Sequence, residues 1–152
     1  MSEKQPFYHY LHQQVRALLD GEADLIAKLA NLSALLKQEL PSINWVGFYL
    51  LKDDELVLGP FQGKPACFRI PVGRGVCGSA IVQGKTLRIN DVHQFDGHIA
   101  CDSASNAEIV IPIRHSGKII GLLDIDSPNF NRFDLQDQLG LEETMLILES
   151  ML

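Results

Sequence analysis

Residues 108–126 read EIVIPIRHSGKIIGLLDID and contain the two strongest strand signals of the chain. Two segments rich in β-branched and aliphatic residues, Glu108 to Arg114 and Lys118 to Asp126, flank a short polar connection at residues 115–117. Apolar runs of this length that are bounded by turn residues are typical of strands, and a short connection containing glycine joins antiparallel neighbours. The stretch therefore predicts a β-hairpin.

The segments on either side of this hairpin predict further helices and strands. Apolar residues recur at helical spacing in three segments, at about 8–19, 23–40 and 135–152. Segments rich in aromatic and aliphatic residues predict strands at 44–51, 56–61, 67–70 and 87–90. Residues 73–84 predict a glycine-rich turn that opens a short helix. Residues 91–107 are polar with little periodicity and predict a long loop, of a kind that is often functional.

This order of elements favours one fold class. Two helices come first, several strands follow, and one helix ends the chain, without a repeating strand–helix–strand rhythm. The pattern predicts an α+β fold in which a mainly antiparallel sheet is covered on one side by the N- and C-terminal helices. A length of 152 residues predicts a single domain over residues 1–152.

Composition narrows the choice of partners and compartment. The net charge of -6 argues against a nucleic-acid or anionic-membrane partner, because both require a cationic surface. The first residues lack the cationic and apolar pattern of a signal peptide, and no apolar run approaches the ~20 residues of a membrane span. We therefore expect a cytoplasmic protein whose thiols are kept reduced.

The three cysteines are the first candidates for chemistry. Cys67, Cys77 and Cys101 lie ten and twenty-four residues apart, which does not match the close pairs of a zinc site. His93, His98 and Cys101 are also spaced too loosely to favour a metal. Cys101 lies in the polar loop, where it is either reactive or a chance surface residue. Cys67 and Cys77 have apolar neighbours, which favours core packing.

Acidic residues form a second candidate group. Asp124 and Asp126 are two residues apart on one predicted strand, so their side chains project from the same face. Pairing through the predicted hairpin would bring Glu108 towards the same end. The group is then either a set of solvated strand ends or a pocket that holds an ammonium group or a shared proton with a raised pKa.

Aromatic residues form a third candidate group on the strand predicted at 44–51. Trp45, Gly47 and Tyr49 alternate along the strand and therefore share one face. Two aromatic rings with a glycine between them can wall a small pocket, although core packing is the commoner role of such a pair.

Four motifs taken together resemble the free methionine-R-sulfoxide reductases. They are NWVGFY at 44–49, GRGVCG at 73–78, HIACDSASNAE at 98–108 and GLLDIDSP at 121–128. Members of this family are single GAF domains that act on the free amino acid. The resemblance covers nearly the whole chain and includes the relative spacing of all three cysteines.

The resemblance implies roles for the candidate residues. Cys101 would be the nucleophile and Cys67 the main resolving residue, with Cys77 a less certain participant. Trp45 and Tyr49 would surround the methyl end of the substrate. The acidic residues would hold the ammonium group and polarise the sulfoxide, with Glu108 or Asp126 as proton donor and Asp124 nearer the ammonium.

The implied activity is the reduction of free L-methionine-(R)-sulfoxide through a cysteine sulfenic acid and an intramolecular disulfide. A thioredoxin-like protein would reduce the disulfide, and neither a metal nor an organic cofactor is required. Two other functions are compatible with the residues, a GAF sensor that binds a small molecule without chemistry and a cysteine redox sensor. An exposed face on the N-terminal helices is compatible with a homodimer.

Overall fold

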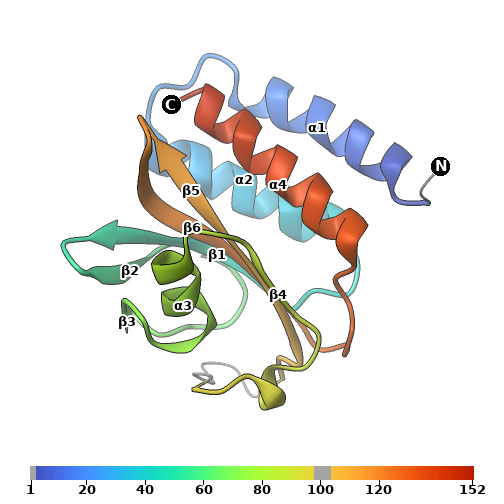
Figure 1. Ribbon diagram of the computed structural model, residues 1–152. Coiled ribbons are helices and arrows are strands. Elements are labelled where there is room, and N and C mark those ends of the chain that lie inside the picture. The colour runs from blue at the N-terminus through green and yellow to red at the C-terminus, as the bar shows by residue number, and fades with distance from the viewer. Residues whose placement is uncertain (1–2, 98–103) are drawn as a thin grey trace.

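The computed structural model describes residues 3–97 and 104–152, in which a six-stranded sheet carries the helices (Figure 1). The strand order is β3-β2-β1-β6-β5-β4, and every neighbouring pair is antiparallel. The α+β class predicted from the sequence is confirmed. The strands are β1 (Trp45–Lys52), β2 (Glu55–Gln62), β3 (Arg69–Pro71), β4 (Leu87–Ile89), β5 (Ala107–His115) and β6 (Lys118–Ser127).

The predicted hairpin is the pair of β5 and β6. The two strands pair from Ala107, opposite Ser127, to His115, opposite Lys118. The connecting residues Ser116 and Gly117 have φ angles of 54° and 78°. Two successive positive φ angles are characteristic of the tight turn whose twist matches that of the flanking strands.

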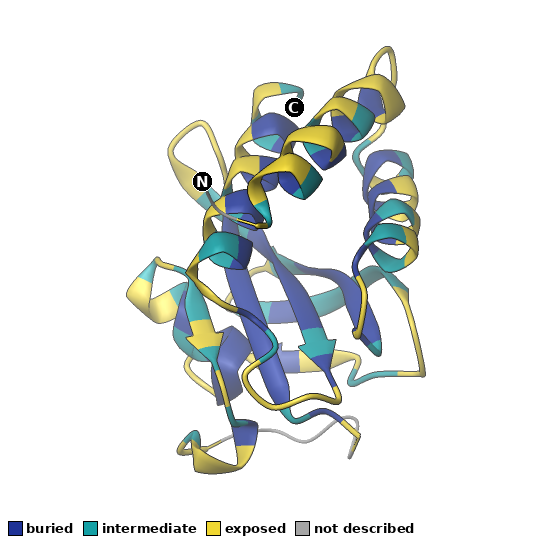
Figure 2. Ribbon diagram, turned by 90° about the vertical axis from the view of Figure 1, so that its right-hand side faces the viewer, coloured by how far each residue is buried: buried dark blue, intermediate teal, exposed yellow. Residues whose placement is uncertain are grey.

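Three helices cover one face of the sheet, namely α1 (Gln5–Leu19), α2 (Leu25–Glu39) and α4 (Leu135–Ser150) (Figure 1). Their apolar sides pack against β1, β5 and β6 to form the larger core, while their outer sides are exposed (Figure 2). α1 begins at Gln5 rather than near Tyr8, because a proline in the first turn is compatible with a helix start. The side chain of Asp24 caps α2 by accepting a hydrogen bond from the backbone N–H of Ala27.

The opposite face of the sheet carries the short helix α3 (Gly75–Gln83) and a smaller apolar cluster. β1 serves both faces because side chains alternate along a strand. Val46 and Phe48 enter the larger core, whereas Trp45 and Tyr49 enter the smaller one. A short 3-10 helix, η1 (Val92–Gln94), lies in the predicted loop, of which residues 98–103 lie outside the described part.

None of the described helices is both long and apolar enough to cross a bilayer.

Asp137 joins the start of α4 to the start of α1. Its buried carboxylate accepts hydrogen bonds from the Tyr8 hydroxyl at 2.6 Å, from Lys4 Nζ at 2.6 Å and from Arg132 Nη1 at 3.2 Å. It also accepts from the backbone N–H of Asp134, whose own side chain caps α4 in return. The carboxylate therefore fixes two helix ends at once.

We predict that Asp137→Ala lowers the free energy of unfolding by about 3 kcal/mol, because it leaves the buried Tyr8 hydroxyl and Arg132 without their acceptor. Urea denaturation of the variant and the parent measures this difference. Glu143→Ala is the matched control, since Glu143 is an exposed carboxylate on the same helix. An equal and small effect of both substitutions would contradict the assigned role.

Candidate active site

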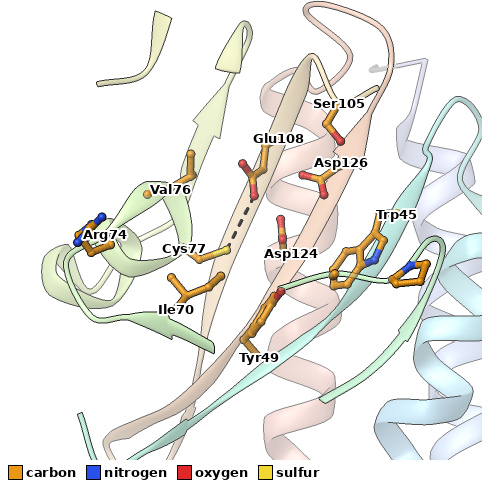
Figure 3. A pocket seen from close by; sticks show the side chains of 13 residues that line it. Trp45, Tyr49, Ile70, Arg74, Val76, Cys77, Ser105, Glu108, Asp124 and Asp126 are labelled. Carbon is orange, nitrogen blue, oxygen red and sulfur yellow. Dashed lines mark hydrogen bonds between the residues drawn. The ribbon is translucent and has the colours of Figure 1, made fainter. Parts of the chain in front are cut away.

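The register of the β5–β6 hairpin places three carboxyl groups on one face of the sheet. Glu108 lies directly opposite Asp126, and Asp124 lies two residues along, opposite Val110. All three line a pocket between the sheet and α3, with a cavity of about 40 Å³ (Figure 3). Glu108 and Asp124 are each 6% exposed, so the reading as solvated strand ends is wrong for these two residues.

Trp45 and Tyr49 form the aromatic wall of the same pocket. Their ring centroids are 6.1 Å apart with the planes inclined by 25°. Phe61 of β2 stacks on the outer side of Trp45 at 5.3 Å. The polar ends of both residues are anchored, because Trp45 Nε1 donates to the backbone oxygen of Lys64 at 3.1 Å and the Tyr49 hydroxyl donates to that of Cys67 at 2.8 Å.

Gly47 permits this aromatic stack. A Cβ atom at this position would lie 2.3 Å from the Cβ of Phe61 and 2.7 Å from the Trp45 ring. Both distances are far below van der Waals contact, so a larger residue would push the two rings apart. Gly47 therefore supports the aromatic wall by leaving room for Phe61 against Trp45.

The first turn of α3 brings Cys77 beside the carboxyl groups. Its thiol donates to Glu108 Oε2 at 3.8 Å and points into the pocket (Figure 3). Cys77 is free and 5% exposed. The N-cap residue of this helix, Arg74, makes no side-chain hydrogen bond to the first turn.

Burial raises the pKa values of two acidic groups in the pocket. The pKa of Glu108 is raised well above its usual range, first by burial and then by repulsion from Asp124 and Asp126. Burial also raises the pKa of Asp124, although hydrogen bonds from its neighbours act in the opposite direction. Burial and the adjacent carboxyl groups raise the pKa of the Cys77 thiol. The pocket therefore holds a carboxyl group that stays protonated at a pH where most carboxyl groups are ionised.

Of the other two cysteines, the structure describes Cys67 but not Cys101. Cys67 is half-buried, is disulfide-bonded, and is held through its carbonyl by Tyr49. Cys101, the candidate nucleophile, lies outside the described residues. The pocket thus gathers Trp45, Tyr49, Cys77, Glu108, Asp124 and Asp126, with Cys67 one contact away.

Several residues of the pocket were not singled out from the sequence. They are Pro65, Ala66, Ile70, Arg74, Gly75, Val76 and Ser105. Ser105 is buried and accepts a hydrogen bond from Asn44 Nδ2 at 3.1 Å, which joins the end of the long loop to the start of β1. The glycine-rich motif at 73–78 could have indicated that Arg74 and Val76 line the pocket, because glycine-rich turns allow the backbone to approach a ligand closely.

Comparison with known proteins defines the class. The family model described as GAF domain matches residues 29–148. The fold also matches the structure of the free methionine-R-sulfoxide reductase (fRMsr) of Staphylococcus aureus in its reduced form, with a TM-score of 0.93 and 53% identity over 95% of this chain and 94% of that one. The chain is therefore a GAF-domain protein.

Two further relatives narrow the class. The free methionine-R-sulfoxide reductase of Escherichia coli is 58% identical over 98% of this chain and 90% of its own length. The Neisseria meningitidis enzyme of the same name, solved in complex with its substrate, has a TM-score of 0.94 and 46% identity over 99% of this chain and 91% of that one. The chain belongs to the free methionine-R-sulfoxide reductase family.

We predict that stability depends on pH through Glu108. Above the usual value of 4.5 the unfolded chain releases this proton, whereas the folded chain keeps it until the raised pKa is reached. The folded state then binds more protons, so its free energy of unfolding falls as pH rises, by at most about 1.4 kcal/mol per pH unit. Glu108→Gln removes the titrating group and with it this fall in the free energy of unfolding. The stability of the variant relative to the parent should therefore increase with pH.

Urea denaturation at several pH values between 4.5 and 9 measures this trend, with Glu143→Gln as the control for an exposed carboxyl group. A difference between Glu108→Gln and the parent that stays constant over the whole range would contradict a raised pKa at Glu108.

Proposed function

We propose that this chain reduces free L-methionine-(R)-sulfoxide to L-methionine. The observation that carries the proposal is one pocket in which buried carboxyl groups face an aromatic wall, with the pKa of Glu108 raised by burial. Such a pocket can hold an ammonium group and protonate an oxygen within reach of the same ligand. Relatives named free methionine-R-sulfoxide reductase, one of them solved with its substrate, support this assignment.

Binding of the free amino acid uses three parts of the pocket. Asp124 Oδ1 is buried without a hydrogen-bond partner and would accept from the substrate ammonium. Trp45 and Tyr49 would surround the methyl end. The N-cap residue of α3, Arg74, makes no side-chain hydrogen bond to the backbone N–H groups of the first turn. These groups suit the substrate carboxylate, because helix N-termini attract anions.

The same carboxyl cluster explains selectivity for the free amino acid. A methionine sulfoxide residue within a peptide has no ammonium group. Its binding would bury carboxylate oxygens without a donor, which costs several kcal/mol in an apolar site.

Proton donation activates the sulfoxide. A thiolate attacks the sulfoxide sulfur readily only when the oxygen accepts a proton, because the sulfur–oxygen bond must break. Glu108 or Asp126 would supply that proton, since the raised pKa of Glu108 keeps a proton in the cluster near neutral pH.

The cysteine chemistry then balances in three steps. The Cys101 thiolate, the sulfoxide and one proton give methionine and a sulfenic acid on Cys101. The sulfenic acid and a second thiol give a disulfide and water. An external dithiol reduces this disulfide to two thiols and is itself oxidised to a disulfide.

Cys67 is our choice for the resolving thiol, and Cys77 is the alternative. Cys67 is disulfide-bonded and half-buried, so it is within reach of both a partner thiol and a reductant. Cys77 is a free, buried thiol whose raised pKa disfavours the reactive thiolate. The nucleophilic role of Cys101 follows from the resemblance of its motif.

The cellular setting follows from this chemistry. A thioredoxin-like protein in the cytoplasm is the proposed electron donor, because thiols there are kept reduced. A homodimer is also part of the proposal. Leu135, Leu139 and Leu146 are exposed along α4, and Leu18 is exposed on α1, so the helical layer offers apolar surface to a second copy.

We predict that the reduced protein consumes the R epimer of free L-methionine sulfoxide and leaves the S epimer. Cys101→Ser should abolish turnover. Cys67→Ser should release about one methionine per chain and then stop when thioredoxin is the reductant, because the sulfenic acid is not converted to a disulfide. Cys77→Ser is the matched control and should retain sustained turnover.

Chromatography of the products with each epimer separately measures these outcomes. Absence of turnover by reduced, folded protein would favour a GAF sensor that binds a small molecule without chemistry. Disulfide formation with peroxide in the absence of sulfoxide turnover would favour a redox sensor.

We also predict that kcat/KM falls at least about 100-fold for N-acetyl-L-methionine-(R)-sulfoxide, because acetylation removes the charge that the buried carboxyl groups bind. The methyl ester, which keeps the ammonium group, is the matched substrate and should lose less. Equal rates for the acetylated and free amino acids would exclude the carboxyl cluster as the ammonium site.

A further inference from the structure

Cys77 is a buried thiol that the proposed reaction does not need when Cys67 is the resolving thiol. Cys67 carries a disulfide, whereas Cys77 stays free among the carboxyl groups of the pocket. An ammonium ligand is bound by carboxylates alone, so its binding does not explain a thiol at this place. Thiols and carboxylates that converge in a pocket are, however, ligands for metal ions.

The ligand atoms have the separation that a metal ion requires. One ligand atom each from Cys77, Glu108 and Asp124 lies within 4.8 Å of the others. Cys77 Sγ and Glu108 Oε2 are 3.8 Å apart. Tetrahedral zinc, with Zn–S of about 2.3 Å and Zn–O of about 2.1 Å, places sulfur and oxygen about 3.6 Å apart. Small side-chain rotations would close the remaining difference.

Asp124 provides an independent indication that the cluster accepts a positively charged ligand. Its Oδ1 is buried and lacks a hydrogen-bond partner, while the side chain points into the pocket beside Glu108 and Cys77 (Figure 3). A buried carboxylate oxygen without a donor costs free energy that a bound cation would recover.

We propose that Cys77, Glu108 and Asp124 form a three-ligand site for a divalent, thiophilic cation such as Zn²⁺. The cavity of about 40 Å³ leaves room for a water molecule as the fourth ligand, since one water needs roughly 10–15 Å³ on the same measure. Binding releases the thiol proton and changes no oxidation state. The thiolate selects Zn²⁺ over Mg²⁺ and Ca²⁺, which prefer oxygen ligands.

The cation and the amino acid would exclude each other. The Asp124 oxygen that would hold the ammonium group is also a metal ligand, and both cannot occupy the pocket. Zinc would therefore act as a competitive inhibitor at a site that needs no metal for its chemistry. The site itself does not rest on the proposed function, because its ligands are fixed by the fold alone.

Zinc titration of the full chain tests the site. Cys67→Ser/Cys101→Ser is the background, because it leaves Cys77 as the chain's one thiol. Competition with a chromophoric zinc chelator should show one Zn²⁺ per chain. Adding Cys77→Ser, Glu108→Gln or Asp124→Asn should each weaken binding by at least about 100-fold, since loss of even an outer-shell partner costs 10- to 100-fold. Glu143→Gln on the same background should bind zinc as tightly as the background, and circular dichroism checks that each variant is folded.

Cobalt gives a second measurement that reports the thiol directly. Co²⁺ bound to the background protein should show thiolate-to-metal charge-transfer absorption in the near ultraviolet, and Cys77→Ser should abolish it. L-methionine should weaken zinc binding to the background in proportion to its concentration. Equal zinc affinity with and without Cys77, or no binding by the folded background, would overturn the proposal. Zinc binding in a protein without sulfoxide turnover would leave the metal site standing and refute only the reductase.

Discussion

The pairing register of β5 and β6 is the constraint on which the site depends. Because Glu108 pairs opposite Asp126 and Asp124 follows two residues along, three acidic side chains are forced onto one face of the sheet. A shift of one residue would turn the side chains of one strand to the other face. The tight turn at residues 116–117 and the one-residue register shift between Ile113 and Arg114 set this register together. Features at the far end of the hairpin therefore determine where the carboxyl groups lie.

The cluster of buried carboxyl groups lowers stability, and the fold places it on a different face of the sheet from the core that stabilises the domain. Burying acidic groups side by side is unfavourable, as the raised pKa values of Glu108 and Asp124 show. The larger apolar core lies on the other face of the same sheet, where α1, α2 and α4 cover it. The helical layer thus stabilises strands whose other face carries α3 (Figure 1) and the pocket with the buried carboxyl groups.

The sequence predicted what depends on local pattern and alternation. The hairpin, the three long helices, the shared face of Trp45 and Tyr49 and the nearness of Glu108 to Asp124 all follow from periods of two or 3.6 residues. The position of Cys77 beside Glu108 does not, because the packing of α3 on the sheet joins residues far apart in the chain. Cysteine spacing alone therefore gave no indication of a cluster that combines one thiol with two carboxyl groups from other elements.

The alternation of side chains along β1 has a consequence for the evolution of this chain. Val46 and Phe48 face the large core, whereas Trp45 and Tyr49 line the pocket, so substitutions at neighbouring positions of β1 affect different properties. A substitution at Val46 or Phe48 changes the packing of the large core, and one at Trp45 or Tyr49 changes the wall of the pocket. A new specificity can therefore arise by substitutions at every other position of one strand while the folding of the domain is left to the residues between them.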